Sequence, residues 1–232
     1  MNIVITGASK GIGKAIAGKF AQQGNTLLLC ARNRETLEQA ATEIKSTYPL
    51  SVVEVMPADL SKKEETNSFA DWCLSFGTPD ILVNNTGSFT PGTILNEPEG
   101  ALENMINTNL YSAYYLTKKL APAMVQAGRG HIFNICSVAS LQAYENGGSY
   151  SISKYAMNGF SQNLRHELKA HGIKVTAVFP GAVLTDSWGN FDNSGNRIME
   201  AYDVAEMILA ATKLSPQAVT EEIVMRPQLG DL

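Results

Sequence analysis

The chain has 232 residues, 44% of them hydrophobic, and a formal net charge of −4 at pH 7. That length suits one domain with a full core. The acidic balance does not favour broad contact with nucleic-acid phosphates or anionic membranes, although a local basic site for a small phosphorylated ligand stays compatible with it. No apolar run approaches the ~20 residues that span a bilayer, and the N-terminus leads directly into an apolar run without a basic leader. We therefore expect a cytoplasmic protein with no membrane or nucleic-acid partner.

Neither the cysteines nor the histidines have the spacing of a metal site. Cys30, Cys73 and Cys136 lie far apart and include no Cys-x-x-Cys pair. We therefore expect buried thiols in a reducing compartment, with no zinc site and no disulfide framework. The three histidines are also scattered along the chain, so no metal is expected.

Apolar runs typical of strands alternate with stretches that carry apolar residues at helical spacing. Expected strands cover residues 3–5, 26–30, 52–55, 81–83, 131–136, 175–179 and 222–225, and expected helices cover about 12–20, 37–44, 102–124, 149–171 and 203–214, with one more after Ser61. This alternation indicates β-α-β units, in which helices cover both faces of a parallel sheet. We expect one α/β domain over residues 1–232, with a doubly wound parallel sheet of about seven strands.

Two local features bound or interrupt these elements. Ser61 and Glu64 have the spacing of a capping box, which predicts a helix start there. Residues 186–200 are rich in polar residues and glycine and separate the sixth strand from the last helix. That segment fits either a mobile surface loop or a lid over a substrate, and Trp188 and Phe191 within it favour the lid.

A glycine-rich turn follows the first strand and opens the first helix. Its sequence is Thr6-Gly7-Ala8-Ser9-Lys10-Gly11-Ile12-Gly13. Glycines permit a tight turn and let the backbone approach a pyrophosphate, and the helix N-terminus adds free N–H groups and a positive dipole end. Glycines also serve ordinary turns, but the place of this one between a strand and a helix predicts a dinucleotide site.

The end of the second strand bears on which dinucleotide is bound. A carboxylate usually holds the ribose 2′-hydroxyl of NAD at this place, but here Arg32 follows the strand. A guanidinium suits a 2′-phosphate, and Lys10 adds a second positive charge. Each cation singly also fits a solvated loop residue, whereas together with the missing acid they favour NADP(H). Asp59 fits either a hydrogen bond to the adenine amino group or a turn ahead of Ser61.

The spacing Tyr-x-x-x-Lys places a phenol and an ammonium one helical turn apart. A neighbouring cation favours the phenolate, which suits an acid/base group. The spacing occurs three times, in Tyr114 with Lys118, Tyr115 with Lys119, and Tyr150 with Lys154. Only the third pair follows a strand that ends in a serine, Ser137, where ligands of doubly wound sheets lie. We therefore predict that Tyr150 supplies the proton and that Ser137 donates to the substrate oxygen, whereas the other two pairs serve helix packing.

The chain resembles the short-chain dehydrogenase/reductase family over essentially its full length. The motifs that carry the resemblance are Thr6-Gly7-x3-Gly11-Ile12-Gly13, Asp59, Asn84-Asn85-Thr86-Gly87, Asn109, Ser137, Tyr150-x3-Lys154 and Pro180-Gly181-Ala182-Val183-Leu184-Thr185. Several independent motifs in one order are specific. The resemblance implies a Rossmann-like fold and metal-free hydride transfer between a nicotinamide and a carbonyl/alcohol pair. Thr86 departs from the alanine usual in its motif, which adds a hydroxyl and bulk without abolishing binding.

The resemblance also implies catalytic roles for four residues. Tyr150 is the acid/base, and Ser137 orients the substrate carbonyl. Lys154 binds the nicotinamide ribose and tunes Tyr150, and Asn109 holds a water in a proton relay through Lys154.

The cofactor site follows partly from the residues discussed above and partly from the resemblance. The resemblance implies that Asn84 shapes the adenosine side, that Val183 offers its backbone to the carboxamide, and that Thr185 contacts the amide or the pyrophosphate. The whole expected set is Gly7, Ser9, Lys10, Gly11, Ile12, Gly13, Arg32, Asp59, Leu60, Asn84, Thr86, Gly87, Tyr150, Lys154, Pro180, Gly181, Val183 and Thr185.

The substrate is a small carbonyl or alcohol, and the residues leave its identity open. A 3-oxoacyl thioester, a 3-hydroxy acid and a pterin-type diketone are candidates. The C-terminal tail lacks the Gly-Gly ending usual in 3-oxoacyl-carrier-protein reductases and looks more like the branch with sepiapterin reductases and 3-hydroxy acid dehydrogenases. Candidate pocket residues are Phe89, Ser137, Tyr144, Trp188 and Phe191, whose aromatic members fit ordinary core or loop positions equally well. Arg197 is the one cation to test as a carboxylate clamp.

We therefore expect an NADP(H)-dependent oxidoreductase that acts reversibly on the CH–OH group of its donor. One alternative is an NADP(H)-binding redox sensor without turnover; another is a sugar-nucleotide epimerase of the extended family, for which the C-terminal region leaves little room. The resemblance also implies a homodimer or homotetramer formed through the two long helices, with Tyr114 and Tyr115 as candidate interface residues.

Overall fold

The computed structural model describes residues 1–231 and builds them around one parallel sheet. The strands are β1 (Asn2–Thr6), β2 (Thr26–Ala31), β3 (Val52–Pro57), β4 (Ile81–Asn84), β5 (Gly130–Ile135), β6 (Ile173–Pro180) and β7 (Glu222–Met225). Their order is β3-β2-β1-β4-β5-β6-β7. The strand order reverses between β1 and β4, and ligands of such sheets lie outside the carboxyl ends of the strands at this switch point. The predicted fold class is confirmed.

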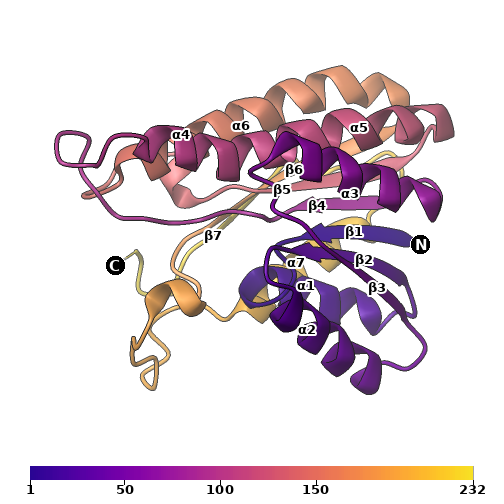
Figure 1. Cartoon of the computed structure of the whole chain (residues 1–232), viewed down its shortest axis with the longest axis horizontal. Helices are drawn as coiled ribbons and strands as arrows, with labels where there is room; N and C mark the ends of the chain where they lie inside the picture. The colour runs from indigo at the N-terminus through magenta and orange to yellow at the C-terminus, as the bar shows by residue number, and fades with distance from the viewer. Residues whose placement is uncertain (232) are drawn as a thin grey trace.

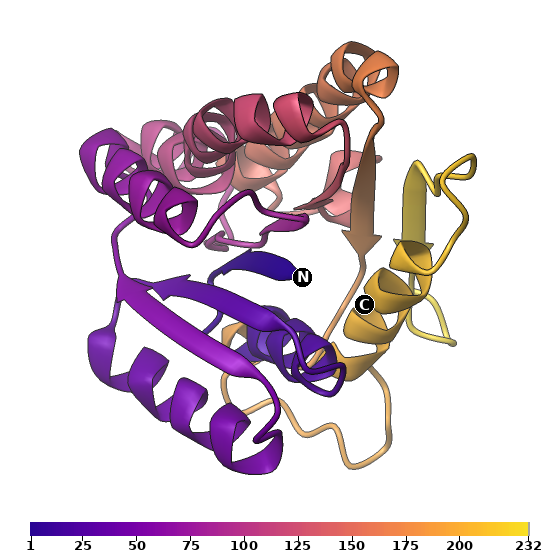
Figure 2. The ribbon, with the colours of Figure 1, turned by 90° about the vertical axis from the view of Figure 1, so that its right-hand side faces the viewer.

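Helices cover both faces of the sheet (Figures 1 and 2). On one face lie α1 (Gly11–Ala21), α2 (Arg34–Thr47) and α7 (Ala201–Thr212); on the other lie α3 (Lys63–Ser75), α4 (Ala101–Ile106), α5 (Ser112–Ala127) and α6 (Gly148–Leu168). Helices α1 and α7 pack together, as do α3 and α5. Among the described residues, no helix is both long and apolar enough to cross a membrane.

Neighbouring residues of the central strands point to opposite faces and build two cores. Ile3 and Ile5 of β1 pack with α1 and α7, whereas Val4 between them packs with α3 and α5. Leu27 and Leu29 of β2 lie with the first cluster and Leu28 with the second. Because both faces are covered, these strands read as continuous apolar runs.

Three local predictions were wrong in detail. The helix expected over 102–124 is broken by a π-helical turn, Asn107–Tyr111, between α4 and α5. The predicted capping box is absent, because Ser61 donates to Asp59 and Glu65, one residue after Glu64, accepts from the backbone N–H of Asp59.

The helix expected over 149–171 ends earlier than predicted. Helix α6 spans Gly148–Leu168 and is followed by a 3₁₀ turn, Lys169–His171. Residues 186–200 form one short 3₁₀ turn, Asp186–Trp188, and then an irregular loop in which Met199 makes an isolated parallel bridge to Val183, outside the seven strands.

Candidate active site

The glycine-rich turn has the backbone shape that only glycines allow. Gly7 and Gly11 adopt positive φ angles of 64° and 53°. A Cβ on Gly13 would lie 2.2 Å from the carbonyl oxygen of Gly7. Helix α1 begins here with Lys10 as its N-cap and no side-chain hydrogen bond at that cap. The turn therefore presents helix N–H groups without a capping side chain, which suits a pyrophosphate.

The two asparagines at the end of β4 have different surroundings. Asn85 lines the cavity described below, and its side-chain amide donates to the carbonyl oxygens of Thr6 and Gly7 at 2.9 and 3.1 Å. Asn84 turns the other way and donates from the buried core to Thr117 and Asn134. The structure therefore places Asn85, and not the predicted Asn84, at the side of the glycine-rich turn.

Thr86 joins the same turn through its backbone. The N–H groups of Asn85 and Thr86 both donate to the Thr6 hydroxyl at 2.9 Å. These bonds fix the end of β4 against the end of β1, and they leave the Thr86 hydroxyl out of the contact. The residue therefore keeps the motif's backbone geometry despite its larger side chain.

Arg32 and Asp59 lie at the ends of adjacent strands. Asp59 accepts from the backbone N–H of Ser61 at 3.1 Å and from its hydroxyl at 2.7 Å, which is the turn geometry expected of it. Partial burial opposes ionisation, but these bonds and the charges of Arg32 and Lys62 lower the pKa of Asp59 below its ordinary value. Leu60 is buried in the core, so its side chain is not available to a ligand.

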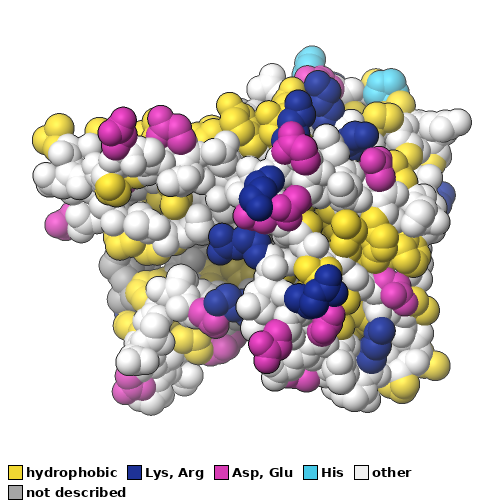
Figure 3. All heavy atoms as spheres, in the orientation of Figure 1, with side chains coloured by type: hydrophobic (Ala, Val, Ile, Leu, Met, Phe, Trp, Pro, Cys, Tyr) yellow, Lys and Arg dark blue, Asp and Glu magenta, His cyan; other side chains and the backbone are white. Residues whose placement is uncertain are grey.

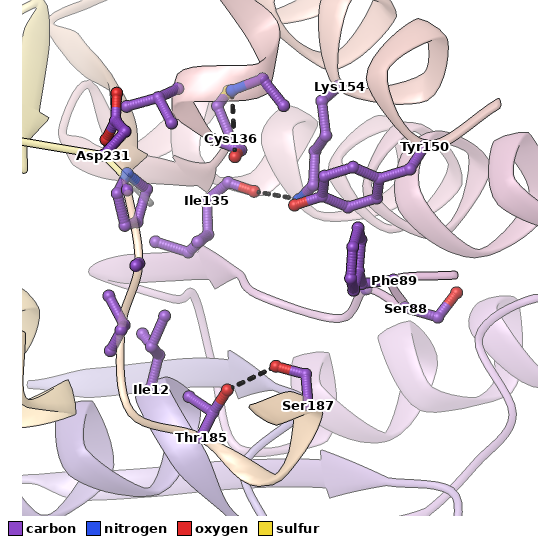
Figure 4. A pocket seen from close by; sticks show the side chains of 18 of the residues that line it. Ile12, Ser88, Phe89, Ile135, Cys136, Tyr150, Lys154, Thr185, Ser187 and Asp231 are labelled. Atoms are coloured by element: carbon purple, nitrogen blue, oxygen red, sulfur yellow. Dashed lines mark hydrogen bonds between the residues drawn. The ribbon is translucent and has the colours of Figure 1, made fainter. Parts of the chain in front are cut away.

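Tyr150 and Lys154 stand one turn apart on α6 and face the cavity (Figure 4). The Lys154 ammonium is buried, donates to the backbone oxygen of Ile135 at 2.9 Å, and lies 5.8 Å from the centre of the Tyr150 ring. Phe89 packs edge-on against the Tyr150 ring, with 4.9 Å between ring centres. The phenol is thus held between an apolar ring and a fixed cation.

Ser137 lies two residues after the end of β5 and is the N-cap of a short 3₁₀ turn, Val138–Ser140. Its hydroxyl oxygen accepts from the N–H of Ala139 at 3.2 Å. A serine hydroxyl has one hydrogen to donate, and the hydrogen bonds within residues 1–231 do not use it. Ser137 can therefore donate to a ligand oxygen in the cavity.

Asn109 sits in the π-helical turn and is buried. Its side chain bonds both backbone groups of Ser88, accepting from the N–H at 2.7 Å and donating to the oxygen at 3.0 Å, and it donates to the Ser153 hydroxyl at 2.9 Å. A Cβ on Gly87 would lie 3.3 Å from the Asn109 oxygen and 3.6 Å from the Lys154 nitrogen. Asn109 therefore anchors the segment after β4 beside Lys154.

The other two Tyr-x-x-x-Lys pairs lie on α5, outside the cavity. Tyr114 packs against Phe160 and Tyr115, and Lys119 pairs with Asp71 at 3.4 Å. These pairs therefore make surface contacts on α5 and do not share the cavity of Tyr150.

These side chains surround a cavity of about 400 Å³. It opens in the hollow between the part of the molecule that carries α4 and the loop 186–200 (Figure 3). The predicted residues that line it are Ile12, Gly87, Phe89, Ser137, Tyr144, Tyr150, Lys154, Pro180, Gly181, Val183, Thr185 and Trp188. Phe191 does not line it and instead packs against Trp188, with 5.2 Å between ring centres.

Two further side chains of the wall keep their protons. Burial, with a smaller effect of Tyr150, raises the pKa of Tyr144 to about 12. Burial likewise raises the pKa of Cys136 to about 11. Tyr144 is therefore a hydrogen-bond donor at neutral pH, and Cys136 is an unreactive thiol.

The segment after β6 reaches across to the glycine-rich turn. A Cβ on Gly11 would lie 3.2 Å from the Thr185 methyl group, and Lys10 pairs with Asp186 at 2.6 Å. The bridge to Met199 uses the oxygen of Ala182 and the N–H of Leu184, so the N–H of Val183 stays out of it. Lys10 is therefore paired with a carboxylate of the segment after β6.

The C-terminal tail closes one side of the cavity. Asp231 lines the wall away from Tyr150 (Figure 4) and pairs with Arg226 at 2.9 Å. Arg197 donates to the backbone oxygens of Gly230 and Asp231 at 3.0 and 3.1 Å. Arg197 therefore holds the tail and is not the carboxylate clamp considered from the sequence.

Several residues that line the cavity were not predicted from the sequence, and the sequence patterns that could have indicated them differ. Asn85 stood inside a quoted motif and could have been chosen over its neighbour. Ile135 belongs to an apolar strand and adds the backbone oxygen that binds Lys154, and Gln142 and Asp231 reach the cavity from irregular segments without a motif.

Comparison with known proteins gives consistent results. The model of the short chain dehydrogenase family matches residues 1–195. An uncharacterized oxidoreductase of Staphylococcus aureus is 31% identical over 97% of this chain and 96% of its own length. The crystal structure of a metagenomic short-chain oxidoreductase in complex with NADP is 32% identical, with a TM-score of 0.86 over 98% of this chain and 97% of that one. An alcohol dehydrogenase from Thermococcus sibiricus, complexed with 5-hydroxy-NADP, is 27% identical, with a TM-score of 0.91 over 100% and 98% of the two chains.

Proposed function

Because this chain belongs to the short-chain dehydrogenase/reductase family of oxidoreductases, we propose that it is an NADPH-dependent carbonyl reductase that runs in reverse as an alcohol dehydrogenase. One observation carries the proposal. Tyr150, Lys154 and Ser137 converge on a single cavity, while the two other tyrosine–lysine pairs face elsewhere. A redox sensor without turnover needs no such convergence, and we do not retain that alternative.

The glycine-rich turn closes so tightly on itself and on Asn85 that Gly7 and Gly13 leave no room for a Cβ. A tight turn of this kind at a helix start supports a bound dinucleotide. Arg32 and Lys10 support a preference for the 2′-phosphate, as do the NADP complexes of similar proteins. Both cations also have a carboxylate neighbour, Asp59 and Asp186 respectively. We expect the phosphate to share or displace these carboxylates.

The chemistry requires one hydride and one proton. The hydride for the carbonyl carbon would come from NADPH held at the glycine-rich turn. Tyr150 gives its proton to the carbonyl oxygen, which becomes the alcohol, while Ser137 donates a hydrogen bond to the same oxygen. Lys154, fixed on Ile135, stabilises the phenolate that remains. Asn109 holds Ser88 and Gly87 beside Lys154, and we propose that a water on this side returns the proton.

The charges in the cavity favour a substrate without a carboxylate. Within the described chain, Lys154 and Asp231 are the only charged side chains in the lining, and Lys154 already bonds Ile135. A substrate carboxylate would meet no uncommitted cation there and would lose solvation without a partner. We therefore favour neutral ketones, diketones or oxo-esters over 3-hydroxy acids, with Phe89, Tyr144 and Trp188 against their apolar parts.

A panel of carbonyl compounds tests both parts of the proposal. NADPH oxidation is followed with a neutral diketone, a hydroxyketone, ethyl acetoacetate and acetoacetate. We expect the ester to exceed the acid in kcat/KM by about tenfold or more, since ~1.4 kcal/mol of unpaired charge suffices for that ratio. No oxidation with any compound would refute the reductase, and equal use of ester and acid would refute only the charge argument.

We also propose, as the family resemblance implies, a homodimer or homotetramer through the long helices. Large side chains are exposed on both long helical segments, namely Tyr111 and Tyr114 at the start of α5 and Ile152 and Tyr155 on α6. Exposed apolar side chains of this kind are expected of surfaces that are buried on assembly. A monomeric mass in light scattering would contradict this.

A further inference from the structure

The segment between β4 and α4, residues 85–100, holds the start of α6 at two points. Phe89 packs its ring against Tyr150. Glu97 accepts from the backbone N–H of Ser149 at 2.8 Å through one carboxylate oxygen and from the Ser149 hydroxyl through the other. Ser149 immediately precedes Tyr150, so both contacts act on the same helical turn.

Helix α6 has no cap of its own. It begins at Gly148, and its N-cap residue, Gly147, has no side chain to offer. The first N–H groups of a helix need acceptors, and an anion placed there also interacts favourably with the helix dipole. Glu97 lies 52 residues before Ser149 in the sequence. It supplies that acceptor in place of an N-cap side chain.

The backbone is shaped to admit this carboxylate. A Cβ on Gly148 would lie 2.1 Å from a Glu97 carboxylate oxygen, and one on Gly92 would lie 2.8 Å from Glu97 Cγ. Gly148 has a φ of 35°, in the region that favours glycine. Gly92 in turn donates to the oxygen of Asn146 at 3.0 Å. Glycines on both segments thus leave room for one side chain, Glu97.

We infer that Glu97 is a positioning residue that fixes the first turn of α6 and so holds the Tyr150 hydroxyl in place relative to Ser137 and Lys154. The inference rests on the proposed role of Tyr150. Tyr150 is the third residue of the helix, where unsupported ends fray. Misplacement of a reacting group by about 1 Å can cost on the order of 100-fold in rate.

The test compares Glu97→Ala with Glu97→Gln. Gln keeps an oxygen that accepts from Ser149, so we expect its kcat to stay within about threefold of the unaltered enzyme. Ala removes the acceptor, and we expect kcat to fall by about 10- to 100-fold while the Kd for NADPH, measured by calorimetry, changes by less than about twofold. Equal losses in both variants, or a parallel loss of kcat and NADPH affinity, would overturn the positioning role.

A matched control separates positioning from loss of a helix cap in general. Asp203 caps the start of α7 by accepting from the N–H of Glu200 at 2.9 Å, and α7 lies outside the cavity. Asp203→Ala should lower the Tm by an amount similar to Glu97→Ala, since each variant loses the acceptor of a backbone N–H at a helix start, yet leave kcat unchanged. Tyr150→Phe is measured alongside. Full activity in Glu97→Ala with an inactive Tyr150→Phe refutes this inference alone, whereas full activity in Tyr150→Phe refutes the proposed function.

Discussion

We predict that the buried His131 makes the free energy of unfolding of this protein depend on pH. Its ring is buried on β5, stacks on Phe133 with 3.9 Å between ring centres, and meets the Thr176 hydroxyl at 2.7 Å. Thr176 itself donates to the oxygen of Thr220, so the nitrogen facing it is the one that carries the hydrogen. Burial, with a smaller effect of Lys174, lowers the pKa of His131 from 6.5 to about 3. The histidine is therefore neutral in the folded state well below neutral pH.

The sign and size of the effect follow from proton linkage. In the unfolded chain, His131 binds a proton once the pH falls below its ordinary pKa of 6.5. In the folded protein it does so only at about pH 3. Stability is therefore full above pH 6.5 and falls as the pH drops from there towards about 3. At about 1.36 kcal/mol per pH unit, roughly 2 kcal/mol of the free energy of unfolding is lost between about pH 7 and pH 5.

Urea unfolding of the unaltered protein and His131→Gln at several pH values measures this loss. Gln keeps an N–H for Thr176 but does not titrate. We expect the variant to be less stable at neutral pH and to lose about 2 kcal/mol less than the unaltered protein over the same pH range. Parallel pH curves for the two proteins would refute the reasoning.

Two further predictions concern the cofactor site. Gly13→Ala should weaken NADPH binding by about 100-fold or more, since its Cβ would collide with the Gly7 oxygen; Gly18→Ala on the same helix, with no atom nearer than 4.0 Å, should bind normally and gain up to about 1 kcal/mol of stability. Calorimetry and urea unfolding distinguish the pair, and normal binding by the Gly13 variant would contradict the proposed phosphate site. Arg32→Asp should lower kcat/KM with NADPH by about 10- to 100-fold, because a charged hydrogen bond to the 2′-phosphate contributes about 1.5–3 kcal/mol, and should improve use of NADH. An unchanged coenzyme ratio would remove Arg32 from the site.

The parts of the site that the sequence predicted are those set by short-range backbone rules. The spacing of Gly7, Gly11 and Gly13 alone predicts a strand-to-helix turn. The alternation of strands and helices predicts a parallel sheet, in which the carboxyl ends of all strands lie at one edge. Ser137 could be chosen over other serines because it lies just past the end of a buried strand. These inferences need only the local period of the chain and the topology.

The errors arise where long-range contacts decide. Asn84 and Asn85 are neighbours at the end of a strand covered on both faces, so no polar alternation tells which of them points to the cavity. The π-helical turn at Asn109 has the same apolar pattern as a plain α-helix. What sets it apart is that Asn109 bonds to the backbone of Ser88, which lies on another segment. Arg197 was misjudged because its partners belong to the C-terminal tail. None of these contacts leaves a local pattern.

Turnover by Tyr150→Phe is the most direct test of the central claim, that this phenol delivers the proton. The variant retains the ring that packs on Phe89 and loses only the hydroxyl, and Tyr114→Phe on α5 serves as the matched control. We predict an unchanged Kd for NADPH and a fall in kcat of about 100-fold or more for Tyr150→Phe, with full turnover in the control. A Tyr150→Phe enzyme that reduces the same carbonyl at the original rate would contradict the assignment.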